Sequence, residues 1–277
     1  MHDEIHHLPS IKETLKNNKV KINRGLGQNF LFDLNLTNKI VKGSTKFAST
    51  IIEIGPGPGS LTRSILKNKS AVVYAIDKDI QSEKMLTDLK IIYKDRLKII
   101  IDDALHYPIW KLGKAPRQII ANLPYNTGTK MLINWLKYID KFDLLTLMFQ
   151  KEVADRIVAK PGSKNYGRLS ILTNWLTQSS KLFDIPKEAF IPRPKVNSTV
   201  IQLKPHTKPL SNVSFESLEK ITHLAFSQRR KMLKSSLKDI NGKKILEELN
   251  ISPNLRAENL SIIEFCKIAK KSLELNS

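Results

Sequence analysis

Short apolar runs that each end in a polar or glycine-rich segment recur along the first half of the chain, and this pattern restricts the fold more than any other. The runs cover 50–54, 71–76, 97–101 and 119–120. Short apolar runs bounded by turn residues predict buried strands, and segments with helical spacing lie between them. Strands that alternate with helices form a parallel, doubly wound α/β sheet. We expect a further strand over 143–149 and another over 199–203.

The segments between these strands have the apolar spacing and the caps of helices. We expect helices over 10–17, 33–41, 61–66, 128–138 and 151–159, and one after the second strand that extends through residue 89. Ser10 and Glu13 have the spacing of a capping box, and Asp33 is a suitable N-cap. From residue 215 onward, apolar residues recur at helical spacing, which predicts a small helical region.

The residues that follow the predicted strands are suited to binding a nucleoside. Carboxyl ends of parallel strands meet at one edge of a sheet, where open α/β folds bind ligands. Gly55 and Gly57 would let the backbone approach a ligand, but their spacing is that of neither the dinucleotide fingerprint nor the P-loop. Asp77 follows the next strand, as expected for a carboxylate that binds a ribose diol. Asp103 suits an adenine amino group. Together they predict a pocket for an adenosine joined to an amino acid, although each carboxylate alone could be a helix N-cap.

The segment Asn122-Leu123-Pro124-Tyr125 has the groups needed to methylate an exocyclic base amine. Such an amine is a poor nucleophile because its lone pair is delocalised into the ring. The amide oxygen of Asn122 and the carbonyl of Leu123 could accept its two N–H bonds. Pro124 stiffens the loop, and Tyr125 offers a flat face for stacking. A plain strand-to-helix turn is the alternative. Beside an adenosine pocket, the segment predicts methyl transfer from S-adenosylmethionine, in which alignment supplies most of the catalysis.

The charge of the chain indicates a polyanionic partner. Lys and Arg number 46 against 26 Asp and Glu, which gives a net charge of +20. Nucleic acid is the leading partner, with a lysine-rich proteome as the alternative explanation. No apolar run approaches the roughly 18–20 residues of a membrane span, and the first residues lack the apolar core of a signal peptide. The single cysteine, Cys266, excludes an internal disulfide and a cysteine-based zinc site. We therefore expect a cytoplasmic, nucleic-acid-binding protein.

A series of segments, in order along the chain, resembles the small-subunit (16S) rRNA adenine N6,N6-dimethyltransferases of the KsgA/RsmA family. The segments are Gly27–Leu31, Glu53–Gly57, Asp103–Ala104, Asn122–Asn126, Phe149–Val153, Tyr166–Ser170, Phe190–Val196 and Phe226–Lys231. The resemblance covers nearly the whole chain. It implies a Rossmann-like S-adenosylmethionine-dependent methyltransferase domain over 1–205, with a basic extension over 1–24. A small helical RNA-binding domain over 206–277 would follow.

The resemblance also implies a reaction and a partner. Two methyl groups would be transferred to N6 of each of two adjacent adenosines in a 3′-terminal hairpin loop of 16S rRNA. The substrate would be the small ribosomal subunit or its precursor, late in assembly. The bases of an RNA loop are already partly unstacked, which makes them easier to flip into an active site. We expect a monomer that needs neither a metal nor a membrane.

Individual residues receive roles from the resemblance. The cofactor-binding residues would be Asn29, Leu31, Gly55, Gly57, Ala75, Asp77, Asp103 and Asn122. The catalytic residues would be Asn122, Leu123, Pro124, Tyr125 and Phe190, with Phe190 stacked on the flipped adenine opposite Tyr125. The RNA-binding residues would be Arg168, Arg193, Lys195, Arg229, Arg230 and Lys231. The prolines and cations around Phe190 favour an exposed, rigid loop over a core position.

One position departs from the family pattern. In many relatives the ribose-binding carboxylate falls two residues before the strand-end aspartate, and Ala75 occupies that position here. Either Asp77 or Asp79 would substitute from a shifted loop, or backbone and water would hold the ribose.

Three other functions remain open at this point. A large-subunit rRNA adenine methyltransferase would have the same cofactor loop, but the segments 27–30 and 190–196 favour the small-subunit enzyme. A non-catalytic RNA-binding assembly factor is disfavoured by the intact Asn122–Tyr125 segment. A DNA adenine methyltransferase is disfavoured because no segment resembles a DNA target-recognition domain.

Overall fold

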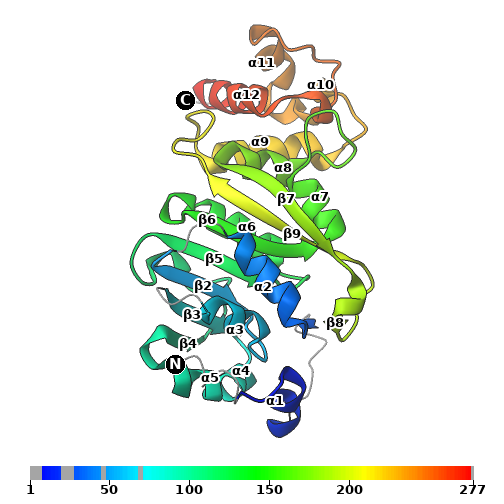
Figure 1. The fold of residues 1–277 in the computed structure, drawn as a ribbon. Helices are drawn as coiled ribbons and strands as arrows, with labels where there is room; N and C mark the ends of the chain where they lie inside the picture. Colours follow the sequence, from blue (N-terminus) through cyan, green and yellow to red (C-terminus); the bar gives the residue numbers. More distant parts are fainter. Residues whose placement is uncertain (1–7, 20–27, 45–47, 68–70, 276–277) are drawn as a thin grey trace. The chain divides into compact units, whose positions relative to one another are not determined.

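The computed structural model describes residues 8–19, 28–44, 48–67 and 71–275 (Figure 1). These residues divide into two compact units. One contains the chain up to residue 154 together with 180–204, and the other contains 155–179 and the chain from 205 onward. The domain boundary at residue 205 stays a prediction. In the structure, the segment 155–179 belongs to the same compact unit as the residues from 205 onward. Gly27 and the remainder of the extension 1–24 outside 8–19 lie beyond the described residues.

The main sheet of the described residues has seven strands in the order β4-β3-β2-β5-β6-β9-β7 (Figure 1). Their bounds are β2 Thr50–Ile54, β3 Val72–Asp77, β4 Leu97–Ile101, β5 Arg117–Asn122, β6 Leu144–Gln150, β7 Thr177–Ile185 and β9 Ser198–Pro205. The strands β2 to β6 are parallel, as the alternation of strands and helices predicted. Strand β9 is antiparallel to β6, so the sheet is mixed at that end. The fold is Rossmann-like, as expected for an S-adenosylmethionine-dependent methyltransferase.

Strand β7 was not predicted from the sequence. It lies at the end of the sheet, and its central residues, Ser180 and Lys181 among them, are polar and largely exposed. An edge strand with few apolar residues lacks the alternation by which strands are identified.

Helices separate the strands in the first unit, and polar side chains cap the N-termini of the first two. Their bounds are α1 Ile11–Asn17, α2 Leu34–Gly43, α3 Ser60–Leu66, α4 Gln81–Met85, α5 Thr87–Tyr93 and α6 Gly128–Leu136, and α7 (Lys151–Ile157) begins in this unit and ends in the second. Ser10 and Glu13 form the predicted capping box, and Asp33 accepts a hydrogen bond of 2.7 Å from the N–H of Asn35. The helix expected through residue 89 is two helices, α4 and α5.

The core of the first unit lies between the parallel strands and the helices that cover them. Ile51, Val73 and Leu97 from three neighbouring strands are fully buried, and they pack in one cluster with Ile65 and Leu66 of α3. Strands that are buried on both faces have continuous rather than alternating apolar sequences, which explains the short apolar runs.

A second, two-stranded sheet joins distant parts of the first unit. Strand β1 (Phe30–Leu31) pairs antiparallel with β8 (Phe190–Ile191), with Leu31 opposite Phe190. Successive side chains on a strand point to opposite faces. Phe190 is accordingly 1% exposed and belongs to the core cluster, whereas Ile191 is 43% exposed. The expectation that Phe190 lies in an exposed loop is therefore wrong.

The second unit is helical, as the spacing after residue 215 predicted. Its helices are α8 Arg168–Leu176, α9 Phe215–Ser227, α10 Leu233–Ser236, α11 Gly242–Glu248 and α12 Ile262–Glu274. Aromatic contacts run from Tyr166 through Phe226 to Phe265 in its interior. Cys266 is fully buried beside them, and burial raises the pKa of its thiol to about 11. Among the described helices, none has the length and apolar character of a membrane span.

Candidate active site

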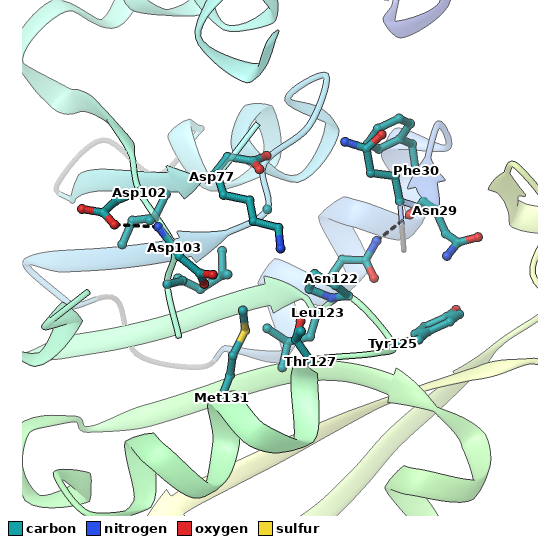
Figure 2. A pocket seen from close by; sticks show the side chains of 17 residues that line it. Asn29, Phe30, Asp77, Asp102, Asp103, Asn122, Leu123, Tyr125, Thr127 and Met131 are labelled. Carbon is teal, nitrogen blue, oxygen red and sulfur yellow. Dashed lines mark hydrogen bonds between the residues drawn. The ribbon is translucent and has the colours of Figure 1, made fainter. Parts of the chain in front are cut away.

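A pocket lies at the carboxyl ends of β2, β3, β4 and β5 (Figure 2). The lining consists of residues 28–30, Ile54, Gly55, residues 76–78, 102–104 and 122–125, Thr127 and Met131. The structure therefore brings together Gly55, Asp77, Asp103 and Asn122, which the sequence pattern placed at one edge of the sheet.

Asn122 ends β5, and the backbone of a distant segment orients its side chain. Its Nδ2 donates a hydrogen bond of 2.8 Å to the carbonyl oxygen of Asn29 (Figure 2). A primary amide donates through nitrogen and accepts only through oxygen. Because Asn29 holds the nitrogen, the oxygen Oδ1 is left to accept a hydrogen bond from a ligand in the pocket. That is the polarity required to bind the N–H of a base amine.

Packing fixes the loop that follows Asn122. Leu123 is 2% exposed, and a Cβ added to Gly128 at the start of α6 would lie 3.0 Å from the Leu123 Cβ. The hydroxyl of Tyr125 lies 2.6 Å from Oγ of Ser198, a fully buried residue of β9. Burial raises the pKa of Tyr125, and the bond with Ser198 opposes this effect. The ring of Tyr125 is therefore a fixed, flat part of the pocket wall, and Ser198 is a partner that the sequence analysis did not identify.

The turn after β2 presents backbone to the pocket. Gly55 and Gly57 have φ angles of 66° and 52°, in the left-handed region that favours glycine. A Cβ at Gly57 would lie 2.5 Å from Cε1 of Phe30. Gly55 lines the pocket, whereas Gly57 lies outside its lining and allows the Phe30 ring to pack on the turn. The N–H of Gly57 also donates to the carboxylate of Asp77.

Asp103 lines the pocket beside Asp102 (Figure 2). One oxygen, Oδ1, accepts a hydrogen bond of 2.9 Å from the N–H of Leu105, as in the N-cap alternative. A carboxylate has a second oxygen and further lone pairs. Asp103 can therefore fix its own turn and still accept an amino N–H from a ligand.

Asp77 ends β3 and lies on the pocket wall. Its Oδ1 accepts from the N–H of Asp79 at 3.0 Å, and its Oδ2 accepts from Oγ of Ser82 at 2.6 Å. Burial raises the pKa of Asp77, and these hydrogen bonds lower it. The turn thus holds a carboxylate in the pocket in one orientation, with lone pairs left for hydroxyl donors.

Ala75 does not line the pocket, contrary to its assignment among the cofactor-binding residues. It is fully buried, pairs with Glu53 across β2 and β3, and packs in the core cluster. Ala75 lies inside the strand, whereas the pocket is built at the strand end, where Asp77 stands. The alanine at position 75 therefore does not deprive the pocket of a carboxylate, because Asp77 provides one at the pocket wall. Asp79 is turned to other partners, Gln28 and Gln81.

Glu53 is a buried acid within the Glu53–Gly57 segment, for which no role was predicted from the sequence. It is 1% exposed, and it lines a smaller cavity beside the main pocket with Leu31, Gly55 and Asn122. Burial raises the pKa of Glu53 to about 8, hydrogen bonds from Thr62 oppose this effect, and the charge of Asp77 adds to the increase. Its Oε2 has no hydrogen-bond partner among the described residues. An acid inside an apolar strand, directly before the glycine turn, was the signal for this residue.

The residues present fit S-adenosylmethionine. Its amino-acid end has an ammonium group, which would supply the missing donor to Oε2 of Glu53. Its ribose and adenine have hydroxyl and amino donors, which suit the acceptors Asp77 and Asp103. A buried carboxylate without a partner is costly, and a cationic ligand offsets that cost.

Phe190 is not part of this pocket. Its ring packs in the core with Leu31 and Val200, and it is absent from the lining. The predicted stacking of Phe190 on a base therefore does not agree with its place in the structure, because the two-residue strand turns Phe190 inward. Among the aromatic residues proposed for catalysis, Tyr125 is the one on the pocket wall.

The cations predicted to bind RNA differ in how they are held. In the first unit, Arg193 pairs with Glu188, and Lys195 is exposed nearby in sequence. In the second unit, Arg168 lies 2.6 Å from Glu219. Arg229 lies 3.0 Å from Glu258 and also donates to the carbonyl of Lys164. Arg230 and Lys231 are exposed and line a surface cavity with Gln228 and Arg229. Several of these cations therefore hold loops in place.

Metal ligands do not gather in the part of the chain that the structure describes. No group of three or more His, Cys, Asp or Glu side chains lies close enough there to hold a metal ion.

Comparisons with known proteins place the chain among rRNA methyltransferases. A family model described as "Ribosomal RNA adenine dimethylase" matches residues 19–273. "Ribosomal RNA small subunit methyltransferase A" of Rhodospirillum rubrum is 44% identical over 265 residues, covering 95% of this chain and 92% of that protein. The protein of the same description from Bartonella tribocorum is 47% identical over 272 residues, covering 96% and 98%.

Solved structures show the same fold. A dimethyladenosine transferase from Plasmodium falciparum has a TM-score of 0.77 at 24% identity, covering 89% of this chain and 98% of that one. The 23S rRNA methyltransferase ErmE has a TM-score of 0.65 at 20% identity, covering 88% and 99%. At these identities the likeness concerns the fold.

Proposed function

The chain belongs to the ribosomal RNA adenine dimethylase family, and we propose that it dimethylates N6 of two adjacent adenosines in the 3′-terminal hairpin loop of 16S rRNA. S-adenosylmethionine is the methyl donor. The relatives described as small-subunit methyltransferases align with this chain over nearly its whole length, which supports the small subunit or its precursor as the substrate. We place the reaction in the cytoplasm and expect the protein to act as a monomer.

The observation that carries the proposal is the orientation of Asn122. Its nitrogen is committed to the carbonyl of Asn29, so its oxygen is the group available to a target amine. An acceptor at this position accepts a hydrogen bond from an N–H of the amine, and this bond localises the lone pair on the nitrogen. An Asn turned the other way would present a donor and repel that N–H. The backbone contact therefore selects the amide orientation that activates N6.

The neighbouring residues position the base. The carbonyl of Leu123 is the second acceptor, and the buried side chain of Leu123 keeps that backbone in place. The ring of Tyr125, fixed by Ser198, provides a stacking surface for an adenine that has left the RNA loop. Pro124 restricts the backbone between them.

S-adenosylmethionine would supply an electrophilic methyl on a sulfonium. As N6 bonds to the methyl and the C–S bond breaks, the positive charge passes to N6, which then loses an acidic N–H proton to water. The chain therefore needs no strong general base, and the described pocket lining contains no histidine. The residues of the pocket bind the cofactor and the target amine and align them with each other. Glu53, Asp77 and Asp103 hold the cofactor, while Asn122 and Leu123 hold the amine. Positioning of two reactants in this way accounts for a large share of catalysis in such reactions.

The second methyl transfer places a further demand on the same groups. After the first transfer, N6 has a single N–H. The contacts to Asn122 and Leu123 then cannot both persist, and the pocket must accommodate a methyl group in place of one of them.

RNA binding outside the pocket is proposed for exposed cations in both units. Arg193 and Lys195 belong to the first unit, and Arg230 and Lys231 are exposed cations of the second. The net charge of +20 supports phosphate contacts as the main source of affinity. Arg168 and Arg229, which pair with carboxylates, would support the shape of the second unit's own surface.

The test is methyl transfer to two matched substrates. Small-subunit particles that lack dimethyladenosine and protein-free large-subunit rRNA are each incubated with the protein and S-adenosylmethionine. Mass spectrometry of nuclease digests should then show N6,N6-dimethyladenosine in the small-subunit RNA alone. Methylation of the large-subunit RNA alone would overturn the proposed substrate. RNA binding without methylation of either would favour an assembly factor.

A further inference from the structure

The segment Gln28–Leu31 forms one wall of the pocket, and both ends of the segment are bonded to other parts of the first unit. Gln28, Asn29 and Phe30 line the main pocket, and Leu31 lines the smaller cavity beside it. The pairing of β1 with β8 anchors the end of the segment, and the Phe30 ring packs on the glycine turn. Two hydrogen bonds attach its beginning to the loops that form the opposite sides of the pocket.

The first bond reaches the turn after β3. Nε2 of Gln28 donates to Oδ2 of Asp79 at 2.8 Å, across 51 residues of sequence. Asp79 is 8% exposed, and its Oδ1 accepts from the N–H of Gln81 at 3.0 Å. The N–H of Asp79 in turn donates to Asp77, the carboxylate on the cofactor side. Gln28 is therefore bonded to a rigid turn that also fixes Asp77.

The second bond reaches Asn122, which together with Leu123 forms the amine clamp, the pair of acceptors proposed for the target amine. The carbonyl of Asn29, the residue directly after Gln28, accepts from Nδ2 of Asn122. Three hydrogen bonds and the covalent chain of Gln28 and Asn29 thus connect Asp77, through Asp79, to Asn122. A shift of Gln28 by one hydrogen-bond length would move the carbonyl that decides which way the Asn122 amide points.

We propose that Gln28 is a positioning residue, whose bond to Asp79 holds the Asn29 carbonyl in register with Asn122 and ties the amine clamp to the cofactor side of the pocket. This inference rests on the proposed role of Asn122 in the function given above. Without the Gln28–Asp79 bond, the first residues of the segment Gln28–Leu31 are no longer held against the turn after β3. The Asn122 amide then loses its fixed orientation, and the cofactor loses part of its enclosure.

The test exchanges the donor and the acceptor. Gln28→Glu places a carboxylate against Asp79 and breaks the bond with little change in size. Asp79→Asn added to it restores a bond in the reverse sense, because the new amide nitrogen at position 79 can donate to the new carboxylate at position 28 while the amide oxygen still accepts from Gln81. We expect Gln28→Glu to lower kcat by at least about tenfold, since a partly buried hydrogen bond to a carboxylate is among the strong ones and the variant sets two carboxylates against each other. KM for RNA should change by less than about twofold, and the double variant should recover most of kcat.

Cofactor release is a second readout that needs no RNA. S-adenosylmethionine should dissociate faster from Gln28→Glu than from the wild type, and the double variant should restore the slower rate. Gln81→Ala is the matched control, because it removes longer contacts of 3.4 and 3.5 Å to the same carboxylate and leaves the Gln28 bond in place. Thermal unfolding of each variant shows whether it is folded.

The outcomes separate the proposals. A folded Gln28→Glu variant with wild-type kcat and cofactor release would overturn the role of Gln28, as would a loss that the double variant fails to restore. A wild-type protein that binds S-adenosylmethionine but methylates neither RNA substrate would instead overturn the proposed function, and the cofactor-release measurement would still test the bond.

Discussion

The two sides of the pocket are held in different ways. On the cofactor side, Asp77 is fixed by Asp79 and Ser82, and Asp103 by Leu105, all within five residues along the chain. On the amine side, Asn122 is oriented by a residue 93 positions away, and Tyr125 is bonded to a residue 73 positions away. A local turn is enough to arrange the carboxylates. The amine clamp takes shape only when distant segments have been assembled around it.

Because of this difference, we expect substitutions on the two sides to change different kinetic and binding constants. Changes on the cofactor side should act mainly on cofactor affinity, because each carboxylate is proposed to contact its own part of the cofactor. Changes on the amine side should act mainly on the rate of methyl transfer, because orientation is what the distant contacts supply.

Asn122→Ala should have the largest effect. It removes the acceptor for the amine and the bond to Asn29 together, so we expect methyl transfer to fall by about 10²- to 10³-fold or more. Affinity for RNA and for S-adenosylmethionine should change much less, which single-turnover kinetics and binding titrations can measure. Asn126→Ala, an exposed asparagine outside the pocket lining, is the control. A parallel loss of RNA affinity would show that Asn122 is a binding residue rather than an aligning one.

Glu53→Gln tests the cofactor side through pH. The carboxyl has a pKa of about 8 in the folded protein against an ordinary value of 4.5, so the folded state retains a proton that the unfolded state loses. The free energy of unfolding of the wild type should therefore fall, relative to the Gln variant, as pH rises from about 4.5 to about 8. Denaturant unfolding at several pH values measures this.

The same residue makes cofactor binding depend on pH. An ammonium group beside Glu53 favours the ionised carboxyl, so cofactor binding near pH 7 should release up to about one proton, and affinity should rise with pH toward 8. Calorimetry in buffers of different ionisation enthalpy counts the protons. The Gln variant should bind the cofactor about tenfold or more weakly and release none. A wild type that releases no proton would show that the ammonium lies elsewhere.

The same contrast explains what could be predicted from the sequence. The strands 50–54 and 97–101, the capping box at Ser10 and the pocket at the strand ends depend on local patterns, and the structure has them where they were expected. Strand-end carboxylates are visible because their position in a short-range pattern determines where they lie.

Features that depend on pairing between distant segments were missed. The polar edge strand β7 is a strand because β9 lies beside it, and Phe190 is buried because β8 pairs with β1. The bonds from Gln28 and Ser198 join segments with no pattern in common. Ala75 shows the opposite error, since a family position was transferred without the strand register that places its side chain in the core.

Ser198→Ala sharpens the comparison on the amine side with a smaller effect. It removes the bond that fixes the ring of Tyr125, and we expect kcat to fall by about three- to tenfold with little change in cofactor affinity. Tyr125→Phe removes the same bond from the other end and keeps the ring. If the bond itself matters, the double variant should be no worse than the poorer single variant. Additive losses would mean that the two residues act separately.

The smallest effects should come from the cations of the second unit. Here too, some side chains are bonded to distant residues and others are not. Arg229 has partners 29 and 65 residues away, whereas no ion pair with Arg230 is found among the described residues. Arg230→Ala should therefore weaken RNA binding a few-fold and reduce the salt dependence by about one phosphate contact, with no change in thermal stability. Arg229→Ala should lower the melting temperature by a few degrees, because it releases a loop held by Glu258 and Lys164. Filter binding over a salt series and thermal unfolding separate the two effects. If both variants lose affinity and salt dependence equally while both remain fully stable, distant partners do not distinguish structural from RNA-binding cations on this surface.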